Sequence, residues 1–386
     1  MNILFVTSYP LEYNSSANIR NWGLVEGLLA NGHKISTLSP YPTDRELFNG
    51  NLLSDYFEKR YWIGSITNKQ DVFHDVLPPN KIKARIKSLA FKLFNYLSVY
   101  DRRSLLVSKI NATAIDKEFD VVISSSDPKS AHLFALKIIR KLPSITKTWI
   151  QYWGDPFSND ISFKRLFGNY FVNKEEKRLI SLADKVIYVS PFTANAIKGK
   201  YPQYERKIHF LPIPYRSSDS VDNDASYELG LIGYFGDYNS TNRNIMPLYQ
   251  SIRDLGYKAN IIGNSDITLE PTELIKIGKR IPSEYLLSVT KNTHIFVCVC
   301  NLHGTQIPGK VYHYVNSGKP IVIILDGENK AELVKYFESF KRFYLCDNTV
   351  ESISSCLKKV VNENKTFGIP DALNPVKIAE AFVNIL

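Results

Sequence analysis

Short hydrophobic runs alternate with helical segments along this chain, and that alternation constrains the fold more than any other feature. The chain opens with MNILFV, a polar loop, a helical pattern from Ile19 to Ala30 that ends at Asn31-Gly32, and a second hydrophobic run, HKISTLSP. A short hydrophobic run bounded by turn residues is typical of a strand buried on both faces of a parallel sheet. The order strand, helix, strand therefore predicts an α/β fold with parallel sheets.

The alternation is interrupted once. Residues 216–226, RSSDSVDNDAS, are polar and show no core periodicity. A chain of 386 residues also exceeds the usual size of one compact domain. We expect a Rossmann-like domain over residues 1–213, a linker over 214–226, a second Rossmann-like domain over 227–370, and a C-terminal helix over 371–386 that can pack back on the first domain.

Composition excludes several classes of protein. Hydrophobic residues make up 44% and charged residues 22% of the chain, as in folded globular proteins, and four cysteines are too few for a disulfide scaffold. No hydrophobic run approaches the roughly 18 residues of a membrane-spanning helix, and the first residues lack the features of a signal peptide. A cytoplasmic protein is therefore expected. The net charge of +10 favours an anionic partner, with a solvated basic surface as the alternative.

Residues 81–110 combine basic residues with a helical hydrophobic period. The predicted hydrophobic stripe comprises Ile82, Ile86, Leu89, Leu93, Leu97 and Tyr100. Lys83, Lys87, Phe91 and Phe94 lie away from this stripe, and lysine mixed with exposed aromatic residues suits an anionic membrane interface. We predict that these four residues contact a membrane. The alternative is a solvated helix whose phenylalanines meet another part of the protein.

Four segments, in their order along the chain, carry a resemblance to a known family. They are NILFVTSYP at the start, LADKVIYVSPFTANAIKGKYP at 182–202, LGLIGYFGDYNSTNRN at 229–244 and IPGKVYHYVNSGKPIV at 307–322. Together they resemble the GT-B glycosyltransferases, in particular the family-four and family-one-like sugar transferases of bacterial surface polysaccharide synthesis. The resemblance implies two Rossmann-like domains facing across a cleft, with the acceptor bound by the first domain, the nucleotide sugar by the second, and no metal or other cofactor.

Two loops of the second domain carry groups suited to a diphosphate. The loop FGDYNSTNR at 235–243 contains Arg243, and LHGTQIPGK at 302–310 precedes a helix with Lys310 in its first turn. Arginine grips phosphate oxygens through two parallel hydrogen bonds, and helix starts attract anions. We predict that Arg243 and Lys310 neutralise the leaving diphosphate, with a plain surface charge as the alternative for each. The other predicted donor-binding residues are Gly236, Asp237, Gly263, Gly304, Thr305 and His313.

The donor-site segment departs from the family pattern at two positions. Aligned on Gly318, retaining members of family four typically carry glutamates where this chain has Thr305 and His313. His313 can still hydrogen-bond a ribose hydroxyl through either ring nitrogen, and a histidine facing solvent or core is the alternative. The loss of both carboxylates weakens the assignment to a retaining reaction and favours inversion.

The stretch QYWGDPFSND at 151–160 places a polar loop directly after a predicted strand, where α/β proteins keep their chemistry. An inverting transferase needs a base that takes the acceptor proton. Some inverting relatives, such as the glucuronosyltransferase of xanthan assembly, carry an aspartate in this loop, and QYWGDP resembles it in position. We predict that Asp155 is the general base. The alternatives are a turn-forming aspartate or one that binds acceptor without moving a proton, and Asp160 and Asp127 are further candidates for the base.

The loop NSSANIR at 14–20 follows the first strand, and by resemblance it faces the reacting sugar and the acceptor. The alternative is a helix N-cap at Asn18 or Ser16, which would not exclude binding. The predicted acceptor-binding residues are Ser15, Ser16, Asn18, Arg20 and Asp127.

These patterns predict a metal-independent glycosyltransferase that leans toward inversion. It would move a sugar from a nucleotide sugar to a glycan acceptor, with a lipid-linked acceptor at the inner face of a membrane favoured. One alternative is a non-catalytic protein that binds sugar nucleotides or glycans on a degenerate GT-B fold. Others are a nucleic-acid-directed glycosyltransferase and an epimerase of related fold. No nucleic acid is expected as a partner, because no nucleic-acid-binding motif appears.

Overall fold

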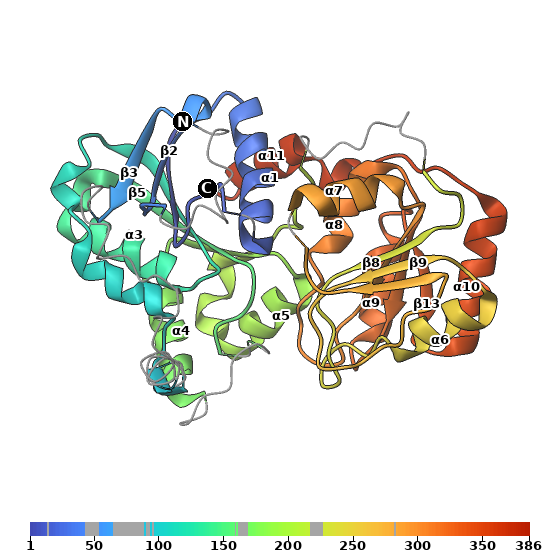
Figure 1. The fold of residues 1–386 in the computed structure, drawn as a ribbon. Helices are drawn as coiled ribbons and strands as arrows, with labels where there is room; N and C mark the ends of the chain where they lie inside the picture. The colour runs from blue at the N-terminus through green and yellow to red at the C-terminus, as the bar shows by residue number, and fades with distance from the viewer. Residues whose placement is uncertain are drawn as a thin grey trace, which may run out of the picture. The chain divides into compact units, whose positions relative to one another are not determined.

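Two compact units make up the chain in this computed structural model (Figure 1). The first unit contains Met1–Pro212 together with Ile378–Leu386, and the second contains Ile213–Lys377. The structure describes residues 1–13, 15–42, 54–64, 89, 93–94, 96–158, 160, 169–216, 227–281 and 283–386. Each unit is built on one parallel sheet, which confirms the prediction of two parallel-sheet α/β domains.

The first unit contains a seven-stranded parallel sheet in the order β3-β2-β1-β4-β5-β6-β7. Its strands are β1 (Asn2–Thr7), β2 (Lys34–Pro40), β3 (Lys59–Ile63), β4 (Phe119–Ser125), β5 (Thr146–Trp153), β6 (Lys185–Tyr188) and β7 (Ile208–Phe210). From Ile3 to Thr7, every residue of β1 is buried. A strand covered on both faces needs no polar alternation, which explains the continuous hydrophobic start of the chain.

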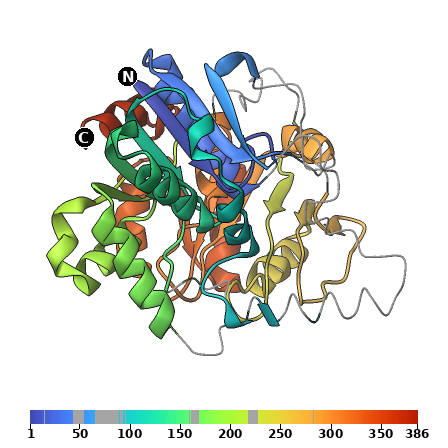
Figure 2. The same ribbon diagram turned by 90° about the vertical axis from the view of Figure 1, so that its left-hand side faces the viewer.

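Helices cover this first sheet. They are α1 (Ser16–Ala30), α3 (Ser130–Lys141), α4 (Tyr170–Leu182), α5 (Pro191–Lys200) and the end of α11 (Pro375–Val383). The helix α3 packs against β1 and β4 (Figure 2). Helix α1 begins earlier than its hydrophobic pattern predicts, because Ser15 acts as the N-cap and accepts a hydrogen bond from the Asn18 amide at 3.1 Å. The predicted cap at Asn18 or Ser16 is therefore wrong by one to three residues.

Three leucines of the predicted hydrophobic stripe do not face the core, whereas Tyr100 at the end of the stripe packs against it. The side chains of Leu89, Leu93 and Leu97 are 69%, 56% and 48% exposed, whereas Phe94 is half-buried. The end of the segment is a 3-10 helix, η2 (Arg102–Lys109), and not an α-helix. The predicted membrane contacts Lys83, Lys87 and Phe91 lie outside the described residues. In the described part of the chain, no helix is both long enough and apolar enough to cross a membrane.

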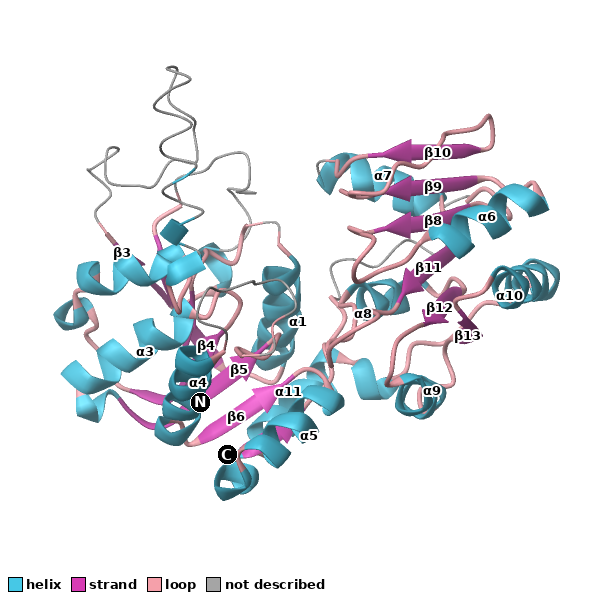
Figure 3. Cartoon of the chain, turned by 90° about the horizontal axis from the view of Figure 1, so that it is seen from below, coloured by secondary structure: helices cyan, strands magenta, loops and turns pink. Residues whose placement is uncertain are grey.

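The second unit contains a six-stranded parallel sheet in the order β10-β9-β8-β11-β12-β13 (Figure 3). Its strands are β8 (Ile232–Phe235), β9 (Ala259–Ile262), β10 (Ile275–Gly278), β11 (Ile295–Val299), β12 (Ile321–Leu325) and β13 (Tyr344–Asp347). Its helices are α6 (Met246–Leu255), α7 (Ser283–Asn292), α8 (Lys310–Tyr314), α9 (Lys330–Glu338) and α10 (Val350–Glu363). Side chains of α6 and α10 form one hydrophobic core with β8, β9, β11 and β12.

The predicted linker 214–226 is only partly described, and its first residues belong to the second unit. The Tyr215 amide donates a hydrogen bond to the Leu373 carbonyl at 3.3 Å, and the Asn316 side chain donates to the Arg216 carbonyl at 3.0 Å. Toward the C-terminus, the Phe382 ring lies 6.2 Å from the Tyr152 ring of β5. The last nine residues, Ile378–Leu386, therefore complete the first unit.

The loops after β8 and β9 press directly against each other. The Gly236 amide donates to the Ile262 carbonyl at 2.9 Å, and a Cβ atom at Gly263 would lie 1.9 Å from the Gly236 carbonyl oxygen. No side chain fits in that space, so packing explains the glycine at 263, whereas a Cβ atom at Gly236 would meet only the side chains of Tyr234 and Arg243, at 3.8 to 4.0 Å. At Gly278, the last residue of the neighbouring strand β10, a Cβ atom would meet only the Ile262 side chain at 3.8 Å.

The substitution Gly263→Ala is expected to lower the free energy of unfolding by about 2 kcal/mol or more, because backbone must move to admit the methyl group. Gly278→Ala is the matched control at the end of the adjacent strand, and it should change stability by less than about 1 kcal/mol. Urea unfolding followed by circular dichroism measures both. Equal stabilities for the two variants would contradict the close approach of the two loops.

Candidate functional site

Charged side chains gather at the carboxyl ends of the central strands of the first sheet. Asp127 follows β4, Asp155 and Asp160 follow β5, Arg20 comes from α1, and Lys129 directly precedes α3. The order of the sheet reverses between β1 and β4. At such a switch point the loops diverge and leave room for a ligand. The structure thus brings together four predicted residues and adds Lys129, which the sequence analysis missed.

Lys129 joins two of the three carboxylates. Its ammonium group forms ion pairs with Asp127 and, at 3.2 Å, with Asp160. Burial disfavours the charged lysine, but the charges of Asp127, Asp160 and Asp155 outweigh that effect and raise the pKa of Lys129. Lys129 therefore stays protonated and ties the loops after β4 and β5 together. Its place two residues after Asp127, at a strand–helix junction, was the available sequence signal.

Asp155 differs from the other two carboxylates of this cluster. Within the described residues it has no ion pair, whereas Asp127 and Asp160 pair with Lys129. Burial and then the charge of Asp127 raise the pKa of Asp155 to about 7, although Lys129 acts in the opposite direction. A carboxyl group with such a pKa can take up and release a proton near neutral pH. Asp155 also lies in a bend, so a turn-forming role remains an alternative.

The loop that carries Asp155 is anchored by Glu176 of α4. Glu176 is fully buried, and one carboxylate oxygen accepts the amide hydrogens of Phe157 at 2.9 Å and Ser158 at 3.1 Å. The other oxygen accepts the Ser158 hydroxyl at 2.8 Å, the Lys200 ammonium at 2.9 Å and the Tyr201 hydroxyl at 3.0 Å. This network fixes the loop against α4 and α5 and so gives the site a rigid support.

Arg20 reaches the same edge of the sheet from α1. It is 5% exposed, and its guanidinium carbon lies 5.3 Å from the centre of the Tyr152 ring. A Cβ atom at Gly154 would lie 1.8 Å from Nη1 of Arg20, so a glycine at this position makes room for the guanidinium group. The Nε and Nη2 groups of Arg20 make no hydrogen bond with the described residues.

The remaining predicted acceptor-binding residues have local structural roles or are exposed. Ser15 caps α1, and the Asn18 side chain donates to the carbonyls of Pro10 at 2.7 Å and Tyr13 at 3.0 Å. These bonds close the loop between β1 and α1 and use both Asn18 donors. Ser16 is exposed. Of these predicted residues, Arg20 is the one with donors, Nε and Nη2, that bind no other described residue.

A second charged cluster lies at the carboxyl ends of β8 and β11 in the second unit. Arg243 donates from Nη1 to the Asp237 carbonyl at 3.0 Å and from Nη2 to the Asn301 side chain at 2.6 Å. These bonds orient the guanidinium plane, while its buried Nε finds no hydrogen-bond partner in the part of the chain that is described. Asn301 was missed, because a single asparagine after a strand carries no specific signal.

Lys310 opens α8 beside this arginine. Burial lowers the pKa of Lys310 to about 8, and the charges of Arg280 and Arg243 also lower it. Cations that are desolvated and act on one another favour an anionic ligand between them. Helix α8 spans only Lys310–Tyr314 before a 3-10 turn. The predicted contribution of a helix start to anion binding is therefore small, and the side-chain charges dominate.

The predicted donor residue Asp237 is already occupied by its neighbours. One carboxylate oxygen accepts the Asn264 amide at 2.9 Å and the other accepts Arg280 at 2.6 Å. This pairing connects the loops after β8, β9 and β10. Gly304 adopts a left-handed φ of 84°, which favours glycine, and the adjoining Thr305 is half-buried.

His313 lies on α8, three residues after Lys310. Burial, together with the charges of Lys310 and Arg216, lowers the pKa of His313 to about 3, so the ring is neutral at physiological pH. Its buried Nε2 has no hydrogen-bond partner within the described residues. A neutral imidazole nitrogen can donate to or accept from a hydroxyl, as the predicted contact with a ribose requires.

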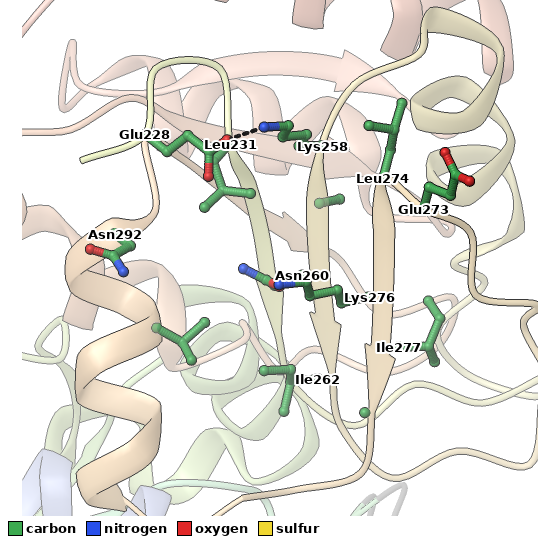
Figure 4. Close-up of a pocket in the computed structure, with 13 residues that line it drawn as sticks. Glu228, Leu231, Lys258, Asn260, Ile262, Glu273, Leu274, Lys276, Ile277 and Asn292 are labelled. Carbon is green, nitrogen blue, oxygen red and sulfur yellow. Dashed lines mark hydrogen bonds and ion pairs between the residues drawn. The ribbon is translucent and has the colours of Figure 1, made fainter.

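A cavity of about 500 Å³ lies elsewhere in the second unit, between β8, β9 and β10 and the helix α7 (Figure 4). Leu231, Ile262 and Val289 supply apolar lining, and an ion pair of 2.6 Å joins Glu228 to Lys258 at its edge. None of the predicted donor-binding residues lines it.

Among the residues described, no group of three or more histidine, cysteine, aspartate or glutamate side chains is arranged to hold a metal ion.

Sequence comparisons leave the family open. No protein-family model matches the chain. An uncharacterised protein of Rickettsia bellii (strain RML369-C) is 29% identical over 140 residues, which cover 36% of this chain and 45% of that protein. The match thus spans less than half the length of the curated relative.

Solved structures resemble the chain over nearly its whole length. Sucrose-phosphate synthase from Thermosynechococcus elongatus has a TM-score of 0.53 at 12% identity, covering 100% of this chain and 96% of that one. An α-glucosyltransferase in complex with UDP and a 13-mer DNA gives 0.52 at 11%, covering 98% and 94%. The glycotransferase of kitacinnamycin gives 0.51 at 11%, covering 100% and 99%. The chain therefore has the GT-B fold of glycosyltransferases, and at these identities the likeness extends to the fold alone.

Proposed function

We propose that this protein is a glycosyltransferase that moves a sugar from a nucleotide sugar to a hydroxyl group of a glycan acceptor. The observation that carries the proposal is Asp155, a half-buried carboxyl group after β5, next to the switch point of a GT-B sheet, with its pKa raised to about 7. A carboxylate with this pKa suits a general base that works near neutral pH. A turn residue at the protein surface would not need to lie beside the charge of Asp127.

In the proposed reaction, Asp155 takes the proton of the acceptor hydroxyl as that oxygen attacks the anomeric carbon of the donor sugar. The new carbon–oxygen bond forms while the bond to the diphosphate breaks, and the electron pair leaves with the diphosphate oxygen. Arg243 and Lys310 would stabilise the negative charge that develops there. Attack opposite to the leaving group inverts the anomeric centre, and these two cations provide the charge that a metal ion would otherwise supply.

The second unit would bind the nucleotide part of the donor. The unused Nε of Arg243 and the desolvated ammonium group of Lys310 are suited to the diphosphate. The neutral ring of His313 is suited to a ribose hydroxyl. One solved structure of this fold is a complex with UDP, which supports a nucleotide as ligand.

The variant Asp155→Asn tests the base. Nucleotide release from UDP-, GDP-, dTDP- and CMP-sugars with lipid-extract acceptors should fall by about two orders of magnitude or more, with donor binding intact. In the wild type, kcat/KM should fall as the pH drops below about 7, because the base must be ionised. In Asp127→Asn the fall in kcat/KM should occur at lower pH, since the charge of Asp127 raises the pKa of Asp155.

Asp254→Asn serves as the control, because Asp254 is a half-exposed residue at the surface of the second unit. Normal turnover by Asp155→Asn would make Asp155 a turn residue and leave the base to Asp127 or Asp160. Donor binding by the wild type without turnover on any acceptor would favour the alternative, a sugar-nucleotide-binding protein on a degenerate GT-B fold.

Binding of UDP should depend on pH through Lys310. The free ammonium group has a pKa of about 8, and a bound diphosphate would raise it, so affinity should fall as the pH rises above 8, by at most about tenfold per pH unit. Lys310→Met should bind UDP more weakly and lose this dependence. Lys330→Met, at an exposed ion pair, is the control. Calorimetry between pH 7 and 9.5 measures the UDP affinity of each protein. If the affinity of the wild type does not change with pH, the assignment of Lys310 to the diphosphate is wrong.

We also propose that this protein is cytoplasmic and binds an anionic membrane surface. A lipid-linked acceptor of surface polysaccharide synthesis would be found at that surface. The exposed side chains of Leu89, Leu93 and Leu97, within a lysine-rich segment, support this contact. These leucines belong to the predicted hydrophobic stripe, so this part of the stripe is exposed to solvent. Phe94, which was predicted to contact the membrane, is half-buried.

Sedimentation with phosphatidylglycerol vesicles, compared with phosphatidylcholine vesicles, tests the membrane contact. The double variant Leu93→Ser/Leu97→Ser should bind at least about tenfold more weakly, whereas Leu287→Ser, an exposed leucine of α7, should bind normally. Equal binding by the double variant would contradict the proposal.

Because one solved structure of this fold contains DNA, the absence of a nucleic-acid partner stays a prediction. Binding of duplex DNA in preference to vesicles would favour a nucleic-acid-directed enzyme.

A further inference from the structure

Arg20 is a buried cation, and its Nε and Nη2 donors have no hydrogen-bond partner among the described residues. The neighbouring Lys129 is paired with Asp127 and Asp160, but Arg20 has no ion pair with any residue that the structure describes. It is 5% exposed, and its Nε and Nη2 groups are buried without a hydrogen-bond partner in the described chain. A guanidinium group cannot lose its proton in a protein, so it keeps a full charge at this place. Burying such a charge without a partner is costly.

The surroundings of Arg20 fix its orientation without satisfying it. The Tyr152 ring lies against one side of the guanidinium group, 5.3 Å from its carbon. Gly154 lies so close that a Cβ atom there would be 1.8 Å from Nη1. Both contacts restrict the side chain, and neither supplies an oxygen acceptor to Nε and Nη2. An arginine held in this way offers a preorganised fork to a ligand.

The aspartates of the cluster do not meet this need. Asp127 is paired with Lys129, and Asp160 pairs with the same ammonium group at 3.2 Å. The charge of Arg20 lowers the pKa of Asp155, so the two groups lie near each other, but no ion pair joins these described residues. A ligand that reaches Asp155 would therefore also come near the free donors of Arg20.

We infer that Arg20 binds an anionic group of the acceptor, a carboxylate or a phosphate, close to the hydroxyl group that Asp155 deprotonates. Two parallel N–H donors of arginine match the two oxygens of either group. An uncharged sugar could accept hydrogen bonds from Arg20 but would leave its charge unpaired. The acceptor would thus be a glycan with an acidic or phosphorylated sugar at the reacting end. The assignment of the anion to the acceptor rests on the proposed function, whereas the anion site itself rests on the contacts of Arg20 alone.

The experiment uses the full chain with ¹⁵N-labelled arginine and follows the Nε–Hε signal of Arg20 by NMR, assigned by its loss in Arg20→Lys. The probes are methyl glucuronide, glucose 6-phosphate and the neutral methyl glucoside. At least one anionic probe should shift this signal and bind about tenfold or more tightly than methyl glucoside. A preference for the first probe identifies a carboxylate, and a preference for the second identifies a phosphate.

Two variants make the outcome decisive. Calorimetry of Arg20→Gln should show that the preference for the anionic probe is lost, whereas Lys147→Gln, which removes an exposed charge at the other end of β5, should retain it. If Arg20→Gln fails to fold, Gly154→Ala takes its place, because a methyl group there displaces the guanidinium while keeping its charge. Equal binding of neutral and anionic probes by the wild type, or an anionic preference that survives these variants, overturns the inference.

The measurement is independent of turnover. If Asp155→Asn keeps full activity but Arg20 binds an anionic sugar, the assignment of the base fails and the anion site stands. If Asp155 is required for transfer but neutral and anionic probes bind equally, the acceptor is uncharged and the proposed reaction stands.

Discussion

The ion pairs of Lys129 with Asp127 and Asp160 determine much of the chemistry of the first unit. They hold the loops after β4 and β5 together at the switch point of the sheet and neutralise part of a dense group of carboxylates. Among the described residues Asp155 has no such pair, and burial together with the charge of Asp127 raises its pKa to about 7. The same pairing occupies Asp127 and Asp160, and Nε and Nη2 of Arg20 have no partner in the described part of the chain. One lysine thus divides the cluster into a structural part and a part available to a ligand.

The two units concentrate opposite kinds of chemistry at the carboxyl ends of their strands. The first presents a carboxylate suited to accept a proton, on a loop that buried Glu176 fixes from α4. The second presents Arg243 and Lys310, cations that burial makes costly unless an anion joins them. Proton acceptance and charge stabilisation of a leaving group are the two needs of sugar transfer from a nucleotide. This division is the physical basis of the proposed function.

Predictions from sequence succeeded where the signal was local. The continuous hydrophobic runs identified strands buried on both faces, and the loop after β5 was recognised because polar residues follow such a strand. They failed where a residue's role depends on distant partners. Glu176 was overlooked, because nothing near it in sequence shows that the amides of Phe157 and Ser158 lie within 3.1 Å. The hydrogen bonds by which Asn18 closes the loop to Pro10 and Tyr13 were also not foreseen, and its role in acceptor binding stays a prediction.

The sequence by itself determined two parallel α/β sheets and the loops at which charged residues would gather, because hydrophobic period and turn chemistry act over a few neighbouring residues. It also indicated Asp155, Arg20, Arg243 and Lys310 by residue type and position. Only the tertiary structure decided which of these charges are neutralised. Burial and pairing depend on side chains brought together from separate strands and helices. They set the pKa of Asp155, and they leave Nε and Nη2 of Arg20 without a partner among the residues that the structure describes.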